Sequence, residues 1–332
     1  MNYLVSGGAG YIGSHVAKKL LAANNQVVVY DSLIKGHKEA VLGGKFVKGD
    51  LADFDLLSKT MKEENIDGVI HLAAHSLVGE SMENPGKYYF NNVANGLNLL
   101  EAMQENDIKY IVFSSTAAVY GEPESVPIKE EHPTRPGNTY GESKLFFEKM
   151  LARYDQIYDF KYASLRYFNA AGADPEARIG EAHDPETHLI PIVLQKASGK
   201  RDKLFIFGDD YPTKDGTCIR DYIHVDDLAD AHVLAIEALI KGMDSRIYNL
   251  GNGEGYSVKE VIDTASEVVG KEIEAEIGER RAGDPAKLVA SSVKIKEELK
   301  WKPKYSDLKT IIETAWNWHQ RGEFGGNEEG RN

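Results

Sequence analysis

Short apolar runs alternate with amphipathic segments through the first half of the chain. The apolar runs are rich in Val and Ile, and they predict strands at 3–5, 26–30, 45–48, 68–72, 110–114 and 162–166. Between them apolar residues recur at helical spacing, which predicts helices at 12–23, 56–64, 88–106 and 140–158. Strands that alternate with helices in this way form βαβ units. The pattern therefore predicts an α/β fold, a Rossmann-like doubly wound parallel sheet.

After residue 169 the pattern becomes less regular. Polar stretches at 183–187 and 209–217 predict long loops, and the elements expected between and after them are shorter, at 189–198, 225–240, 247–250, 258–269 and 308–319. We expect a first domain over residues 1–169 and a smaller mixed α/β region over 170–321. Some segments of that region, such as 225–239, are expected to return to the first domain. Residues 322–332 are expected to form a flexible tail.

Composition and charge narrow the class of protein. Of 332 residues 42 % are hydrophobic and 27 % charged, an ordinary globular mixture. Lys and Arg number 39 against 52 Asp and Glu, a net charge of −13, which argues against binding nucleic acid through a basic face. With neither a secretory leader nor an apolar run of about 18 residues, and with Cys218 as the single cysteine, we expect a cytoplasmic protein and no membrane partner. No Cys/His cluster has zinc spacing, and acidic segments such as 225–230 are interpreted as solvated surface, so no metal site is expected.

A glycine-rich turn, Gly7-Gly-Ala-Gly10-Tyr-Ile-Gly13, joins the first predicted strand to the first predicted helix. Such a turn lets the backbone approach a pyrophosphate at the helix N-terminus. Asp31 ends the second predicted strand, where a carboxylate accepts hydrogen bonds from both ribose hydroxyls and repels a 2′-phosphate. The pattern favours NAD over NADP. A glycine-rich turn that binds no nucleotide is the alternative.

Two further strand ends fit a dinucleotide. Asp50-Leu51 follows an apolar run and could contact the adenine, and the small residues of Leu72-Ala73-Ala74 would let the dinucleotide pass over the strand tips. Taken alone, each segment is also explained by strand-end packing.

Tyr140 and Lys144 stand four residues apart on one face of a predicted helix. An ammonium group, together with a positively charged nicotinamide, favours the phenolate and lowers the tyrosine pKa from about 10. That would make Tyr140 a general base. The same spacing is common on solvated helix faces, but Thr116, at the end of an upstream strand, adds a hydroxyl that can orient a substrate oxygen.

These motifs together resemble the extended short-chain dehydrogenase/reductase superfamily, and over nearly its whole length the chain is similar to the UDP-glucose 4-epimerase family. The segments that carry the closer resemblance include Leu165-Arg-Tyr-Phe-Asn169, Arg220-Asp-Tyr-Ile-His-Val225 and Arg280-Arg-Ala-Gly-Asp284. The resemblance implies an isomerase of galactose metabolism that inverts C4 of a UDP-hexose through a transient 4-keto sugar, with bound NAD accepting and returning the hydride. It also implies a homodimer built on helices 88–106 and 140–158, whose apolar stripes are otherwise explained by packing on the sheet.

The resemblance also implies roles for particular residues. Tyr140 takes the proton of the 4-hydroxyl, Lys144 holds the nicotinamide ribose, and Thr116 bridges to the sugar O4. The residues expected to bind NAD are Gly7, Gly10, Tyr11, Ile12, Gly13, Asp31, Ser32, Leu33, Lys35, Gly36, Asp50, Leu51, Leu72, Ala73, Ala74, Ser76, Asn91, Tyr140, Lys144 and Phe168. Those expected to bind the UDP-sugar are Thr116, Tyr140, Asn169, His188, Leu189, Leu204, Phe205, Phe207, Arg220, Arg281, Asp284 and Leu288.

Two departures from the family pattern, and the bulk of one pocket residue, bear on the substrate and the cofactor. His188 replaces an asparagine that meets the substrate, and Ser76 replaces a lysine near the cofactor phosphates. Leu288 has intermediate bulk at the position that limits the sugar pocket, which leaves acceptance of N-acetylated sugars open. Ala117 and Ala118 stand where related dehydratases carry an acidic residue. The alternatives are a 4-epimerase of UDP-N-acetylglucosamine, a UDP-uronic acid or a UDP-pentose, and a non-catalytic NAD-binding module.

Overall fold

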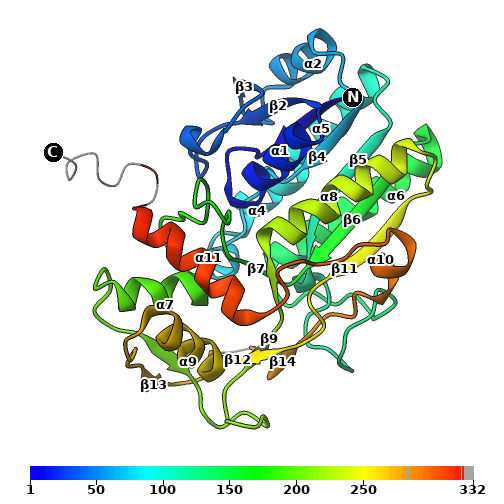
Figure 1. The fold of residues 1–332 in the computed structure, drawn as a ribbon. Helices are drawn as coiled ribbons and strands as arrows, with labels where there is room; N and C mark the ends of the chain where they lie inside the picture. The colour runs from blue at the N-terminus through cyan, green and yellow to red at the C-terminus, as the bar shows by residue number, and fades with distance from the viewer. Residues whose placement is uncertain (282–283, 323, 325–332) are drawn as a thin grey trace, which may run out of the picture.

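A seven-stranded parallel sheet forms the centre of the computed structural model, which describes residues 1–281, 284–322 and 324 (Figure 1). Its strands are β1 (Asn2–Ser6), β2 (Gln26–Asp31), β3 (Lys45–Lys48), β4 (Gly68–His71), β5 (Tyr110–Thr116), β6 (Lys161–Tyr167) and β11 (Arg246–Leu250). Their order is β11-β6-β5-β4-β1-β2-β3, which confirms the doubly wound α/β fold. The order reverses between β1 and β4, and sheets of this kind bind ligands at the carboxyl ends of the strands at such a reversal.

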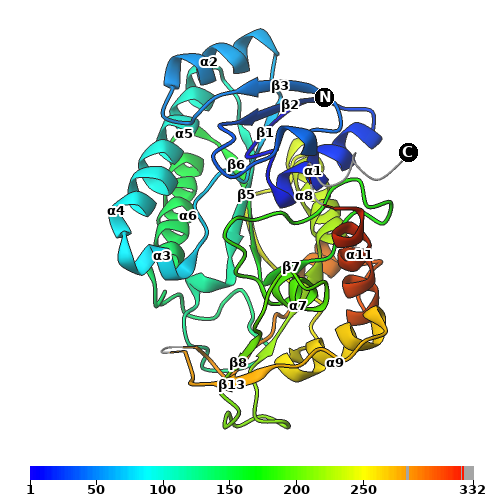
Figure 2. The same cartoon turned by 90° about the vertical axis from the view of Figure 1, so that its left-hand side faces the viewer.

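Helices cover both faces of the sheet. Figure 2 shows α5 (Asn95–Glu105) and α6 (Thr139–Tyr158) on one side, with α2 (Phe54–Glu63) above them. On the other side α1 (Tyr11–Ala22) packs beside α8 (Val225–Ile240). A buried apolar cluster lies between the sheet and each helical layer. Because the central strands are buried on both faces, they appear in the sequence as continuous apolar runs.

The helix expected at 88–106 is present, but a π-helical turn interrupts its α-helical hydrogen bonding. After α3 (Val78–Glu83) come α4 (Pro85–Tyr88), a π-helical segment at Tyr89–Ala94 and then α5. Within the π-helical segment, the Asn92 amide donates to the carbonyl of His75 at 3.0 Å and to the Ser143 hydroxyl at 3.0 Å. Such segments accommodate one extra residue per turn and are frequent at functional sites. Here it brings a polar side chain between the end of β4 and α6.

The second half of the chain builds a smaller layer below the sheet. Its helices α7 (Leu189–Ala197), α9 (Val258–Val269) and α11 (Leu308–Arg321) enclose a third apolar cluster. Its strands are β7 (Asn169–Ala171) with β10 (Tyr222–His224), β8 (Phe205–Phe207) with β13 (Glu276–Gly278), and β9 (Ile219–Arg220) between β12 (Tyr256–Ser257) and β14 (Lys287–Leu288). From the same half, β11 is the edge strand beside β6, α10 (Val293–Glu298) follows β14, and α8 packs on α1.

The acidic segment 225–230 is not solvated surface, so that interpretation is wrong. Asp226 and Asp227 are buried. Asp226 accepts hydrogen bonds from His15 at 2.6 Å and Lys18 at 2.9 Å, whereas Asp227 accepts from the N–H groups of residues 304 and 305. Burial alone would raise the pKa of Asp226, but the contacts with His15 and Lys18 outweigh it and hold that pKa well below its usual range. The two carboxylates therefore link α8 to α1 and to the segment before α11.

Most of the expected tail lies outside the described residues. Within it, Phe324 places its ring 5.0 Å from that of His37 and 4.9 Å from that of Trp318. Among the helices of the described residues, none is long and apolar enough to cross a membrane.

Candidate active site

The glycine-rich turn lies at the carboxyl end of β1, beside the reversal of strand order. Gly10 is the N-cap of α1, and within the described residues no side chain caps it, so the first N–H groups of the helix can meet an anion. Gly7 has φ +76°, and a Cβ on Gly13 would lie 2.1 Å from the carbonyl oxygen of Gly7. Only glycine allows this closure. The turn fits a dinucleotide pyrophosphate.

Asp31, at the end of β2, uses one carboxylate oxygen for each of two backbone N–H groups. They belong to Ala9, at 3.0 Å, and Leu33, at 2.8 Å. Burial raises the pKa of Asp31, and these two N–H groups act in the opposite direction. Each oxygen has a further lone pair, so the carboxylate suits the hydroxyl pair of a ribose.

The other residues expected at the cofactor lie along the same edge of the sheet. The N–H groups of Leu72 and Ala73 donate to the carbonyl of Ser6, which places 72–74 against the turn. Asp50 accepts a hydrogen bond from the Tyr30 hydroxyl at its carbonyl oxygen. Lys35 donates to the carbonyl of Asp184 at 2.5 Å and so ties the loop after β2 to the loop before α7.

The start of α6 brings Tyr140 to the end of β5. Asn138 caps the helix by accepting from the N–H of Gly141 at 2.8 Å. A Cβ on Gly141 would lie 2.5 Å from the carbonyl oxygen of Ala118, so the glycine lets the helix pack directly on the 3₁₀ turn Ala117–Val119 that follows Thr116. Tyr140 and Thr116 are both 8 % exposed. The packing of Gly141 on Ala118 thus holds Tyr140 beside the turn that follows Thr116.

Burial dominates the ionisation of Tyr140 and Lys144 in the chain by itself. It raises the pKa of Tyr140 to about 12, although the Thr116 hydroxyl acts to lower it. It lowers the pKa of Lys144 to about 7. The Lys144 ammonium donates to the carbonyl of Ser114 at 2.7 Å and lies 6.0 Å from the centre of the Tyr140 ring. In the chain alone both groups lose the solvation of their charged forms, so the expected lowering of the tyrosine pKa stays a prediction for the chain with the positively charged nicotinamide bound.

The residues expected on the substrate side pair with one another. Arg220, in β9, makes an ion pair with Asp284, and the Arg281 guanidinium lies 4.1 Å from the centre of the Phe207 ring. The Asn169 amide donates to the carbonyl of residue 221 at 2.8 Å.

Leu204 differs from the two aromatic residues of the same segment. Its side chain is buried in the apolar cluster below the sheet, whereas those of Phe205 and Phe207 are exposed. Leu204 would therefore meet a ligand through its backbone, and its expected place in the substrate site stays a prediction.

Two other expected residues lie just beyond Thr116. Phe168 and Leu288 pack against one small cluster that contains Val119 and Tyr120. The expected limit of the sugar pocket therefore shares a wall with the turn that carries Thr116.

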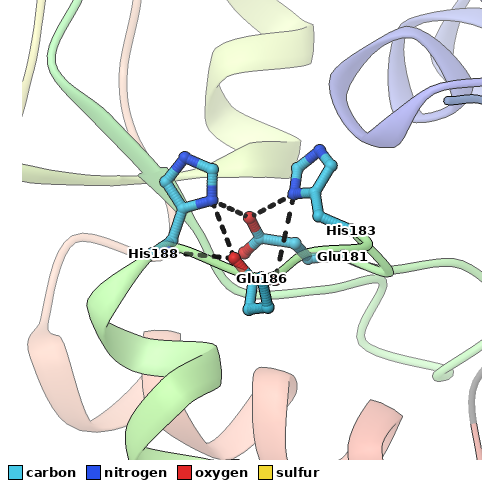
Figure 3. A group of neighbouring side chains, drawn as sticks. All are labelled: Glu181, His183, Glu186 and His188. Carbon is cyan, nitrogen blue, oxygen red and sulfur yellow. Dashed lines mark hydrogen bonds and ion pairs between the residues drawn. The ribbon is translucent and has the colours of Figure 1, made fainter. Parts of the chain in front are cut away.

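His188 directly precedes α7, whose first residue is Leu189, and faces two carboxylates. Its Nδ1 lies 2.7 Å from Glu181 and 3.1 Å from Glu186 (Figure 3). Burial lowers the pKa of His188, but the two carboxylates outweigh it and raise the pKa to about 10. The two histidines of this segment, His183 and His188, in turn hold the pKa of Glu181 at about 2. Glu181, His183 and Glu186 are absent from the sequence-based sites, although the repeated Glu-x-His pattern in 181–188 could have indicated them.

The class of protein follows from the fold, the dinucleotide turn and the Tyr140–Lys144 pair together with the family match. Residues 3–251 match the model of the NAD dependent epimerase/dehydratase family, and the chain belongs to this family. Among its relatives, a UDP-glucose 4-epimerase of Halalkalibacterium halodurans is 56 % identical over 331 residues, which cover 100 % of this chain and 99 % of the relative.

Solved structures of UDP-glucose 4-epimerases are similar to this chain over nearly its whole length. A crystal structure of a UDP-glucose 4-epimerase, 56 % identical, superposes with a TM-score of 0.96 over 98 % of this chain and 99 % of the other. The UDP-glucose 4-epimerase of Brucella ovis, solved in complex with NAD, is 48 % identical, with a TM-score of 0.94 over 95 % of this chain and 97 % of the other.

Proposed function

We propose that this chain inverts C4 of a UDP-hexose, interconverting UDP-galactose and UDP-glucose with NAD kept bound. The observation that carries the proposal is the contact between the start of α6 and the turn after β5, which brings Tyr140 and Thr116 together at the edge that holds the dinucleotide turn. Both structures and sequences of UDP-glucose 4-epimerases match nearly the whole chain.

The side chains divide the chemistry at C4 between them. Bound NAD supplies reversible acceptance of a hydride. The Tyr140 hydroxyl takes the proton of the sugar 4-hydroxyl and returns it, and Thr116 holds the same oxygen. Lys144 supplies a hydrogen-bond donor for the nicotinamide ribose and a positive charge near Tyr140. Ala117 and Ala118 offer no acid to expel a leaving group, which disfavours dehydration.

The two regions of the chain divide the ligands. Residues 1–169 bind NAD through the glycine turn and Asp31 and supply the groups that act at C4, and residues 170–321 bind the rest of the UDP-sugar. The Arg220–Asp284 ion pair separates when substrate enters, so that Arg220 meets the diphosphate and Asp284 the uridine ribose. Arg281 is the second diphosphate contact. The single, buried Cys218 is unpaired in any disulfide and suits a reducing compartment, so the cytoplasm is the proposed location.

A homodimer is part of the proposal. Leu97 of α5 and Phe146 and Ile157 of α6 are exposed, as is Phe90 just before α5, whereas Leu100 and Leu151 on the same helices are buried in the core. Each helix therefore has one apolar face against the sheet and a second that faces outward. An outward apolar face on two adjacent helices is suited to pairing with a second copy.

The test is a conversion assay on the purified chain without added NAD. UDP-galactose should yield UDP-glucose, and Tyr140→Phe should lower kcat by at least about a hundred-fold because the general base is removed. Tyr158→Phe is the matched control, because it deletes a hydroxyl at the far end of the same helix and should keep the wild-type rate.

Other outcomes separate the alternatives. Conversion of UDP-N-acetylglucosamine, a UDP-uronic acid or a UDP-pentose in place of UDP-galactose would change the substrate but keep the reaction. Failure with all of them, with NAD added, would overturn the proposal in favour of a non-catalytic module.

A further inference from the structure

Four side chains in the loop before α7 form a closed ring of alternating imidazoles and carboxylates (Figure 3). Glu181 lies 2.9 Å from Nδ1 of His183 and 2.7 Å from Nδ1 of His188. Glu186 completes the ring, at 3.1 Å from His188 and 3.9 Å from His183. One ligand atom from each residue lies within 4.8 Å of every other.

Two imidazole nitrogens and two carboxylate oxygens are a ligand set typical of zinc and of neighbouring first-row divalent ions. With metal–ligand bonds of about 2.1 Å, tetrahedral ligands lie roughly 3.4 Å apart. Most of the distances around the ring are shorter than this and one is longer, so rotamer shifts of a fraction of an ångström would open the ring around an ion.

The charge of the ring also favours a cation. Glu181 is buried and the Glu186 side chain is 5 % exposed, so two carboxylates are held together away from solvent. A divalent ion neutralises both carboxylates at once, which otherwise takes a proton on each of the two histidines. Buried charges are stable only when they are paired or bound to a metal.

We propose that Glu181, His183, Glu186 and His188 bind one divalent transition-metal ion, of which Zn²⁺ is the best match. The ion cross-links both ends of segment 181–188. The same segment already contacts the dinucleotide-binding half, because Ala182 and Asp184 accept from His37 and Lys35 and the His183 ring lies 6.2 Å from that of Tyr11. The ion therefore fixes this loop over the glycine turn.

The site is compatible with a substrate contact from His188. Its Nδ1 faces the ring, so coordination there leaves the Nε2–H group as a donor for an anion. This compatibility rests on the proposed function, but the metal site itself does not.

The test is metal binding by the whole chain, stripped with a chelator and free of any histidine tag. Calorimetric titration with ZnCl₂ should give about one equivalent per chain, with MgCl₂ bound far more weakly. His183→Ala and Glu186→Gln should each weaken Zn²⁺ binding by at least about ten-fold. His132→Ala removes an imidazole outside the ring and should leave it unchanged.

Two results would overturn the proposal. One is wild-type chain that binds no Zn²⁺ in the titration. The other is binding that survives unchanged in both ring variants, which would place the ion elsewhere. If a variant fails to fold, Co²⁺ bound to the wild-type chain decides: a visible spectrum typical of hexa-aqua Co²⁺ rather than of nitrogen ligands contradicts the site. None of these readouts depends on turnover of a sugar nucleotide.

Discussion

Lys144 donates to the carbonyl of Ser114 and is 4 % exposed, so the fold holds a cation where little water reaches it. The same burial raises the pKa of Tyr140 to about 12. Neither a phenol with a pKa of about 12 nor a poorly solvated ammonium suits general-base chemistry in the chain alone. A bound cofactor that carries a positive charge beside the phenol would favour the phenolate, so we expect the working base to exist only in the holo state.

Because burying the Lys144 ammonium costs free energy, Lys144→Met should stabilise the NAD-free chain while it abolishes conversion of UDP-galactose. The folded pKa of about 7 lies below the unfolded value, so the penalty of the buried charge is complete below pH 7 and is relieved as pH rises toward 10. At pH 6.5 we expect a gain of about 2 kcal/mol, or roughly 3 °C in Tm, and a smaller gain at pH 9.5. Thermal unfolding at the two pH values measures it. Lys149→Met, on the exposed side of the same helix, should change Tm little, and an equal gain in both variants would contradict the argument.

At the scale of elements, the site depends on how α6 packs. Its first turn lies on the 3₁₀ turn after β5. One turn beyond Lys144, Glu148 accepts both a hydroxyl hydrogen bond from Ser115, at 2.6 Å, and two hydrogen bonds from the Arg166 guanidinium, at 2.9 and 2.6 Å. This buried ion pair links α6 to β5 and β6. The helix is thus fixed at two points along its length, which sets the distance between Tyr140 and Thr116.

Gly141→Ala should move the start of α6, because the added Cβ would lie 2.5 Å from the carbonyl oxygen of Ala118. We expect kcat to fall roughly a hundred-fold, as for a displacement of about 1 Å at a reacting group, with KM changed much less. Steady-state kinetics with UDP-galactose gives both constants. Gly137→Ala is the control, since a Cβ there meets nothing within 4 Å in the described part of the chain and should leave kcat unchanged. A wild-type kcat in Gly141→Ala would show that the contact does not position Tyr140.

Across the whole molecule, the large sheet and the smaller layer meet at the carboxyl ends of the strands. Segments from both halves meet at this edge, because the Tyr11 hydroxyl donates to the carbonyl of Gly172, and Lys35 and His37 contact the carbonyls of Asp184 and Ala182. The outward apolar face of α5 and α6 lies on the side of these helices that faces away from the sheet. A dimer through this face would hold α6 between the partner and the sheet.

Phe146→Glu should therefore give a monomer. The charge would be buried against the partner's apolar face, at a cost that a dimer interface of moderate size does not offset. Sedimentation velocity at low micromolar concentration separates the two states. Val293→Glu places the same charge on exposed α10 and should leave the dimer intact. A monomeric wild-type chain would contradict the proposed assembly.

Much of the fold could be predicted from the sequence because its signals are local. The strand at 45–48 and the helices at 225–240 and 258–269 coincide with the structure, and most other ends differ by a few residues. Hydrophobic period distinguishes strand from helix without knowledge of contacts. The π-helical turn within 88–106 escaped prediction because it depends on Asn92 reaching His75 and Ser143 from different elements.

The sequence by itself determined the α/β class, the glycine-rich turn, and the residue types proposed to act as base, cation and hydroxyl. Tertiary structure decided everything that depends on burial or on distance between remote segments. Asp226 and Asp227 look like surface in the sequence and are buried, and the pKa of Tyr140 moves upward because desolvation outweighs the hydrogen bond with Thr116. The ring of Glu181, His183, Glu186 and His188 likewise closes only when the loop before α7 folds. Residue type and hydrophobic periodicity are properties of the sequence, whereas the solvation of a side chain and its distance from remote segments depend on packing.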